Sequence, residues 1–268
     1  WSQNSSDKLI IEADRLVNEG NSYASKNHYT EAETCYLKSI ECWDQVQEYN
    51  EYKAYPYYSL ATLYKKIGNY PNSIKNYTEA EKILLNARDK SKFLLGAIYV
   101  NIGVYYLQYG DQFKALSYLN KAIDILEVMK KGNEIVYSEA VLGKAHAYYY
   151  LKKYSQALDL LTNYIKSEDV INRSQFERLS GSCLLCLGEN QKAIEVLEKS
   201  LTGFKNMPVK YAEALLVAVK AYLKVGYYKK AKEYLAMSFS LLRAYKPEKD
   251  PWNIYYYELL GQLGLAEA

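Results

Sequence analysis

One pattern of small and large residues recurs six times along the chain, and it constrains the fold more than any other feature. A small residue opens each copy, except for a valine in the sixth, and Ala or Ser follows twelve places later. The two places hold Gly20 and Ala32, Ala61 and Ser73, Gly103 and Ala115, Ala145 and Ala157, Gly181 and Ala193, and Val219 and Ala231. Helices approach each other closely only where their facing side chains are small. The pattern therefore predicts six pairs of closely packed helices.

The segments between the paired helices carry signals of helix ends. Four of the turns contain a glycine, which adopts the left-handed conformation after a helix at little cost: Gly68, Gly110, Gly188 and Gly226. Asp111 and Ser155 are polar residues expected to cap second helices, and Pro71 lies in a first helical turn, where proline is tolerated.

The pattern resembles the tetratricopeptide repeat, and the resemblance covers nearly the whole chain. It implies an all-α, right-handed superhelical solenoid of about six helix hairpins plus a C-terminal capping helix, forming a single domain over residues 1–268. The expected repeats span residues 13–47, 54–88, 96–131, 138–168, 174–205 and 212–244, and the capping helix spans 252–266. Ile254, Tyr257, Leu260 and Leu263 lie at helical spacing in this last segment, which is expected to cover the apolar end of the stack.

The copies depart from the family in length and at single positions. They follow one another at intervals of 36 to 42 residues, against about 34 in the family. The family's tryptophan at the fourth place is missing, and in the fifth copy Glu177 stands there, which makes this copy the least regular. In the fourth copy, Tyr164 replaces an expected small residue.

Composition argues against several classes of function. Lys and Arg number 34 against 31 Asp and Glu, a balance that does not favour nucleic-acid binding. Without an apolar run long enough to span a membrane, or a basic start followed by an apolar core, the chain is expected to be cytoplasmic and to bind no membrane. Four cysteines are too few for a disulfide scaffold.

Groups that could carry chemistry are sparse. The two histidines, His28 and His146, have no partner at metal-ligand spacing. Cys183 and Cys186 form a C-x-x-C string within a predicted helix, and small buried thiols explain it better than a redox motif. We therefore predict a protein that is not an enzyme and holds no cofactor or metal.

The resemblance also implies where partners would bind. In the family, the first helix of each repeat lines a concave face, and its inward positions carry over to Asn21, Tyr58, Thr62, Lys65, Lys66, Asn101, Val104, Gln108, Leu142, His146, Tyr149, Tyr150, Arg178, Lys220 and Lys224. The middle of this set is apolar and aromatic, and cations lie toward both sides. Such a surface suits an extended peptide, with side-chain amides for its backbone and cations for its carboxylates. A solvated groove carrying a few surface aromatics is the alternative.

Two narrower resemblances refine the expectation. Some family members bind chaperone tails through a two-carboxylate clamp, but its positions hold Val17 and Ser59 in one register and Glu139 in the other, so we expect no clamp. Repeats near 42 residues, tyrosine-rich helices and a closing helix are similar to peptide-pheromone receptor domains of Gram-positive cytoplasmic regulators.

Two kinds of function remain open. The first is a module that binds a peptide or protein segment in its groove. The alternative is a scaffold that assembles with partner proteins through its outer surface or ends, and a homodimer is compatible with either.

Overall fold

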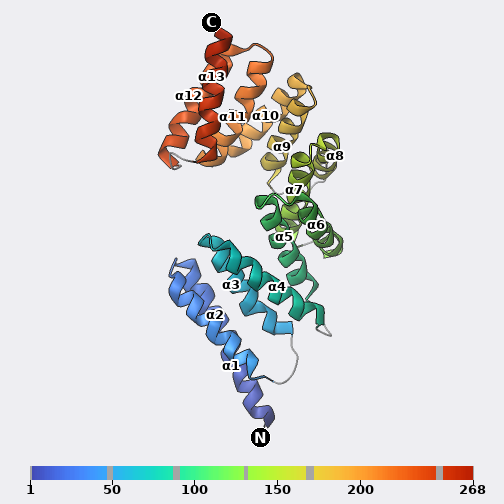
Figure 1. The fold of residues 1–268 in the computed structure, drawn as a ribbon, viewed down its shortest axis with the longest axis vertical. Helices are drawn as coiled ribbons and strands as arrows, with labels where there is room; N and C mark the ends of the chain where they lie inside the picture. Colours follow the sequence, from blue (N-terminus) through green and yellow to red (C-terminus); the bar gives the residue numbers. More distant parts are fainter. Residues whose placement is uncertain are drawn as a thin grey trace. The chain divides into compact units, whose positions relative to one another are not determined.

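The computed structural model describes residues 2–46, 51–86, 91–129, 132–166, 172–245 and 250–267. Within these ranges the chain forms helices and turns, without a strand (Figure 1). The all-α helical-repeat class predicted from the sequence is confirmed. The predicted repeat ends at residues 47, 88, 131 and 168 lie outside the described residues.

The helices of the described chain follow one another as pairs, with a single helix last. Their bounds are α1 (Ser2–Ser25) and α2 (Tyr29–Asp44), α3 (Ala54–Lys66) and α4 (Tyr70–Asn86), α5 (Lys92–Gln108) and α6 (Gln112–Leu126), α7 (Glu134–Tyr150) and α8 (Tyr154–Ile165), α9 (Arg173–Cys186) and α10 (Asn190–Phe204), α11 (Pro208–Lys224) and α12 (Tyr228–Tyr245), and α13 (Pro251–Glu267). Short 3₁₀ turns precede α3 at Glu51–Lys53 and follow α6 at Glu127–Met129.

The chain divides into two compact units, unit 1 (Trp1–Ala140) and unit 2 (Val141–Ala268). In unit 1, α1 packs on α2, α3 on α4 and α5 on α6, and neighbouring pairs meet through α2 with α3 and α4 with α5. In unit 2, α8 to α13 pack successively, and α11 also contacts α9 and α13. A single domain over the whole chain stays a prediction.

Glycine at the first small position lets the two helices of a pair approach closely. A Cβ atom added to Gly20 would lie 2.5 Å from the Tyr36 ring, one at Gly103 2.6 Å from Leu119, and one at Gly181 2.5 Å from Leu197. In each case the large side chain comes from the second helix, sixteen residues on. The small residue of one helix and the large residue of the other therefore form one interlocking contact.

Serine hydroxyls add polar ties between paired helices at the same closely packed places. Ser39 Oγ donates to the carbonyl oxygen of Ala13 at 2.9 Å, and Ser73 Oγ donates to that of Ala61 at 2.8 Å. All these residues are buried. Each serine satisfies its own hydroxyl while keeping the side chain small enough for the close approach.

The helix ends mostly follow the predicted signals. The four turn glycines have φ between 76° and 82°, and Asn27 and Lys152 take the same left-handed place in the first and fourth pairs. Asp111 caps α6, because its carboxylate accepts the backbone N–H of Lys114 at 3.0 Å. The prediction that Ser155 caps α8 is wrong: α8 already begins at Tyr154.

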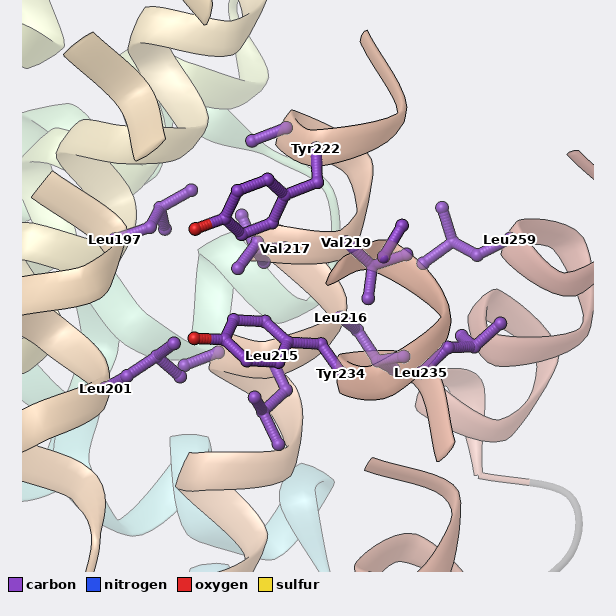
Figure 2. Packing of buried hydrophobic residues seen from close by; sticks show 14 of the residues in the cluster. Leu197, Leu201, Leu215, Leu216, Val217, Val219, Tyr222, Tyr234, Leu235 and Leu259 are labelled. Carbon is purple, nitrogen blue, oxygen red and sulfur yellow. The ribbon is translucent and has the colours of Figure 1, made fainter. Parts of the chain in front are cut away.

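The largest buried cluster of unit 2 lies between α10, α11, α12 and α13 (Figure 2). Tyr222 and Tyr234 lie side by side in it, with their hydroxyls directed toward α10 (Figure 2). Both hydroxyls donate to the carboxylate of Glu198, at 2.8 and 2.9 Å. Burial raises the pKa of both phenols, and the hydrogen bonds to Glu198 raise it further. The two rings thus bury their apolar area while one carboxylate satisfies both polar ends.

The two irregular positions are accommodated within unit 2. Tyr164 stacks on Phe176, with ring centroids 4.4 Å apart. Glu177 is buried, and burial raises the pKa of its carboxyl, while Arg173 and Lys199 act in the opposite direction. The fourth and fifth copies therefore depart from the pattern in residue type but still form helices in the stack.

The apolar face predicted for the last helix is wrong at three of its four residues. Ile254, Tyr257 and Leu260 are 65%, 59% and 43% exposed, and only Leu263 is buried. The buried face of α13 instead contains Tyr256 and Leu259. Both sides of this helix are apolar, so periodicity could not distinguish the side that packs on unit 2.

Close packing at Gly181 gives a stability prediction. Gly181→Ala gains helix propensity but forces the new methyl group against Leu197, whereas Gly261→Ala on α13 makes the same change with nothing within 4 Å of the methyl. We expect Gly181→Ala to be less stable than Gly261→Ala by about 1–3 kcal/mol in the free energy of unfolding, the usual range for overpacking. Urea unfolding below micromolar concentration measures the difference, and equal stability of the two variants would contradict the interlocking contact.

Candidate functional site

Unit 1 contains a cavity of about 590 Å³ between α1, α3 and α5, here called the Asn21 cavity. Four of the predicted groove residues line it: Asn21, Tyr58, Thr62 and Lys66. Val17, Tyr55 and Phe93 add apolar and aromatic surface. The sequence therefore predicted part of this lining correctly, from three different helices.

The polar groups of the Asn21 cavity are engaged within unit 1. Asn21 Oδ1 accepts a hydrogen bond from the Tyr36 hydroxyl at 2.8 Å, and the Thr62 and Tyr77 hydroxyls are 3.0 Å apart. Lys66 Nζ donates to the carbonyl oxygen of Ala24 at 3.2 Å. A ligand here would meet apolar surface and polar groups that already have partners.

The other predicted residues of unit 1 lie outside this lining. Lys65 Nζ donates to Asn101 Oδ1 at 2.7 Å, while Asn101 Nδ2 donates to the carbonyl oxygen of Ala97 at 2.9 Å. Burial lowers the pKa of Lys65, and Glu139 acts in the opposite direction. Val104 packs against the buried cluster, and Gln108 is exposed. Lys65 and Asn101 therefore form their own pair, separate from the Asn21 cavity.

Unit 2 contains a cavity of about 500 Å³, here called the Arg178 cavity, which brings together five of the predicted residues. They are His146, Tyr149 and Tyr150 from α7, Arg178 from α9, and Lys220 from α11. Leu142 and Lys224 lie outside its lining. The inner positions of three first helices thus converge on one cavity, as the repeat register predicted.

Aromatic rings form two walls of the Arg178 cavity. On α7, Tyr150 stacks on His146 at a centroid distance of 6.0 Å and meets Tyr149 edge to face at 5.9 Å. On α13, Trp252 and Tyr255 meet edge to face at 5.9 Å. These surfaces suit a flat or apolar group, because aromatic faces contribute large contact area at little cost in side-chain entropy.

Arg178 is the dominant charge of the cavity. Its guanidinium group lies 5.9 Å from the centroid of the Trp252 ring. Among the described residues it has no hydrogen-bond partner and no carboxylate within 4 Å, although Glu213 lies in the same lining. Burial lowers the pKa of Arg178, and the charge of Glu213 acts in the opposite direction. A largely buried guanidinium group with unused donors is a strong site for a carboxylate.

His146 is neutral beside this cation. Burial, and secondarily the charge of Arg178, lower the pKa of its imidazole to about 4. At neutral pH the ring therefore has one donor and one acceptor nitrogen, both suited to a peptide amide. Lys220 adds a second cation, and its Nζ lies 6.0 Å from the centroid of the Tyr255 ring.

The two cysteines of the C-x-x-C string have different environments. Cys183 is fully buried, and burial raises the pKa of its thiol to about 12. Cys186 is exposed in the cavity lining, with its Sγ 3.8 Å from the Tyr149 hydroxyl, so the expectation of a buried thiol is wrong for this residue. A high thiol pKa makes Cys183 a poor nucleophile.

Sequence reasoning missed four residues of the lining: Cys186, Glu213, Trp252 and Tyr255. A signal for Tyr255 was present. Gly261 follows Val219 by 42 residues, the interval between earlier copies, and this register places Tyr255 at the second, inward-facing place of a seventh copy. The last helix was assigned only a capping role, and for that reason the register was not extended to it.

Two further searches of the described residues bear on the function. They contain no group of three or more His, Cys, Asp or Glu side chains placed to hold a metal ion. None of their helices combines the length and the apolar character needed to cross a membrane.

Comparisons with known proteins identify the repeat. A family model described as tetratricopeptide repeat matches residues 54–128, and a second with the same description matches residues 13–41. The photosystem I assembly protein Ycf3 of Rippkaea orientalis is 34% identical over 73 residues, which are 27% of this chain and 39% of that protein.

Two solved structures share the fold over most of the chain. The apo form of the quorum sensor NprR from B. thuringiensis has a TM-score of 0.73 at 14% identity, over 92% of this chain and 68% of that one. A tetratricopeptide repeat protein from Parabacteroides merdae has a TM-score of 0.68 at 15% identity, over 96% of this chain and 87% of that one. At these identities the likeness shows the fold.

The state of His146 gives a pH prediction. Its pKa of about 4 in the folded chain lies below the ordinary value near 6.5, so the unfolded chain binds the proton first as pH falls. The contribution of His146 to stability is therefore complete above about pH 6.5 and falls between there and about pH 4, by up to about 3 kcal/mol.

An NMR titration of the imidazole, assigned with His146→Gln, should give a midpoint near pH 4. The same variant should unfold with a shallower loss of stability on acidification than the wild type. A midpoint near 6.5 would show that the ring is solvated and that the cavity is not closed around it.

Proposed function

Because this chain is a tetratricopeptide repeat protein, a fold that binds proteins and peptides, we propose that the Arg178 cavity takes up part of a peptide ligand. The part we propose is a carboxylate next to an aromatic or apolar side chain. The unused donors of Arg178 carry this proposal.

A carboxylate on Arg178 would supply what the cavity lacks. Burial without a partner disfavours the charged guanidinium, as its lowered pKa shows. A ligand carboxylate can accept two parallel N–H bonds from it, and bonds to charged groups contribute about 1.5–3 kcal/mol each. Lys220 would strengthen the preference for an anion, while Glu213 would oppose a second negative charge on the ligand.

The aromatic walls would select the neighbouring side chain. Trp252 and Tyr255 lie across the cavity lining from α7, whose Tyr149 and Tyr150 offer further ring surface. A volume of about 500 Å³ accepts one or two side chains, so most of a longer peptide would lie outside the cavity. The imidazole of His146 would bond a backbone amide of the ligand.

The proposal extends to a signalling-peptide receptor that binds its ligand without catalysis in the cytoplasm. Its support is the arrangement of the Arg178 cavity, to which four helices, α7, α9, α11 and α13, contribute side chains. A bound peptide would contact all four and change how firmly they hold together. That a quorum sensor shares the fold agrees with this proposal.

The scaffold alternative has an observation of its own. Three large apolar residues of α13, Ile254, Tyr257 and Leu260, are exposed at the end of unit 2. An assembly factor would use such an end to contact another subunit, and the relative from Rippkaea orientalis is described as an assembly protein. The two functions use different surfaces of unit 2.

A paired peptide array tests the proposed function. Acetylated octapeptides of varied sequence would be made twice, once with a free C-terminal carboxylate and once with a C-terminal amide. We expect binders to carry a carboxylate beside an aromatic or aliphatic residue. Arg178→Gln should weaken the tightest binder at least about tenfold, since a lost charged hydrogen bond contributes about 1.5–3 kcal/mol.

Lys224→Gln is the matched control, because it removes a cation from the same face of the repeat register outside the cavity lining. It should bind like the wild type. Circular dichroism would establish that both variants keep their helices. Unchanged affinity of a folded Arg178→Gln variant, measured by calorimetry, would rule out the Arg178 cavity as the peptide site.

A further inference from the structure

Helix α13 occupies the place of a first helix in the repeat register, although it stands alone in the described chain. Gly261 follows Val219 of α11 by 42 residues, and the same shift relates Ile254 to Ala212, Tyr257 to Leu215 and Leu260 to Ala218. Its other side packs on α11 and α12, as a first helix packs on the repeat before it. The helix is therefore equivalent to α11, one repeat further on.

The two equivalent helices differ in what covers them. Ala212, Leu215, Ala218 and Val219 of α11 are 0–1% exposed, because α12 packs against α11. Their four equivalents in α13 are exposed. This surface, together with Gly264 and Leu265, is here called the open face of α13. It presents to solvent the positions that are buried in the preceding first helix.

Gly261 marks the centre of the open face. The equivalent residues Gly20, Gly103 and Gly181 each receive a large side chain from the paired helix. A Cβ atom added to Gly261 or Gly264 would meet nothing within 4 Å. The open face therefore has the shape that this fold uses to receive a second helix.

We propose that the open face of α13 binds the open face of α13 from a second copy of this chain, in a symmetric dimer with the two helices antiparallel and crossing at Gly261. The face carries both the projecting side chains and the recess that they require. Tyr257 lies four residues before Gly261 and Leu265 four residues after it. A two-fold axis at Gly261 sets Tyr257 of one copy against the Gly264–Leu265 end of the other, twice over.

The chemistry of the face fits a partner identical to itself. Its six residues are apolar or glycine, and Glu258 lies at its edge, where its carboxylate accepts a bond from Gln262 Nε2 at 3.2 Å. No charge therefore has to be buried at the axis. Because a contact between two helices of 17 residues is small, we expect a dissociation constant on the order of 10–100 µM.

Sedimentation equilibrium from 1 µM to 1 mM tests the dimer. Gly261→Glu and Gly261→Lys each place two like charges at the axis, so each alone should raise the dissociation constant at least about tenfold. An equimolar mixture of the two variants should dimerise again, because only the crossing at Gly261 brings residue 261 of both copies together. Tyr257→Glu should weaken the dimer without being rescued by either variant.

Phe113→Glu is the matched control, because it replaces an exposed aromatic residue of α6 in unit 1. It should dimerise like the wild type, and circular dichroism should show unchanged helix content for every variant. A wild type that stays monomeric to 1 mM overturns the proposal. So does a dimer unaffected by Gly261→Glu, or a mixture of the two charged variants that remains monomeric. The peptide array reads the Arg178 cavity separately, so the two proposals can fail independently.

Discussion

The interlocking contact between a small residue on one helix and a large residue on the next is what the rest of this structure depends on. Where Gly20 meets Tyr36, and where Gly181 meets Leu197, the axes can approach only because one side lacks a Cβ atom. That contact fixes the rotation of each first helix about its axis. Once the rotation is fixed, the residues opposite the contact face away from the paired helix, and in unit 2 they line the Arg178 cavity.

The same constraint explains how a cation comes to be held without a partner. Arg178 lies three residues before Gly181, so the turn that carries the close contact also directs the guanidinium into the cavity. The neighbouring side chains adjust to it: His146 stays neutral, and the Trp252 ring lies beside the charge. An aromatic face stabilises a cation by about 0.5–2 kcal/mol, less than a carboxylate would. The cavity is therefore stable when empty but electrostatically incomplete.

The sequence predicted most where spacing alone sets the geometry. The register of small residues identified the helix pairs and placed His146, Tyr149, Tyr150, Arg178 and Lys220 on one side of unit 2. It could not say how far the cavity extends along the helices, so Leu142 and Lys224 share the register but not the lining. It also failed for α13, because Tyr256 and Tyr257 are chemically the same and only packing shows that Tyr256 is buried.

That helix links the two surfaces of unit 2. Trp252 and Tyr255 line the Arg178 cavity, while Tyr257 and Gly261 belong to the open face, and both sets lie within three turns of α13. A peptide that holds α13 in place at the cavity reduces the conformational entropy lost when a second copy docks on the other side. The coupling is reciprocal, so dimerisation must strengthen peptide binding by the same factor as the peptide strengthens dimerisation. The repeat register, carried one helix further than its last complete pair, thus brings recognition and assembly onto a single helix.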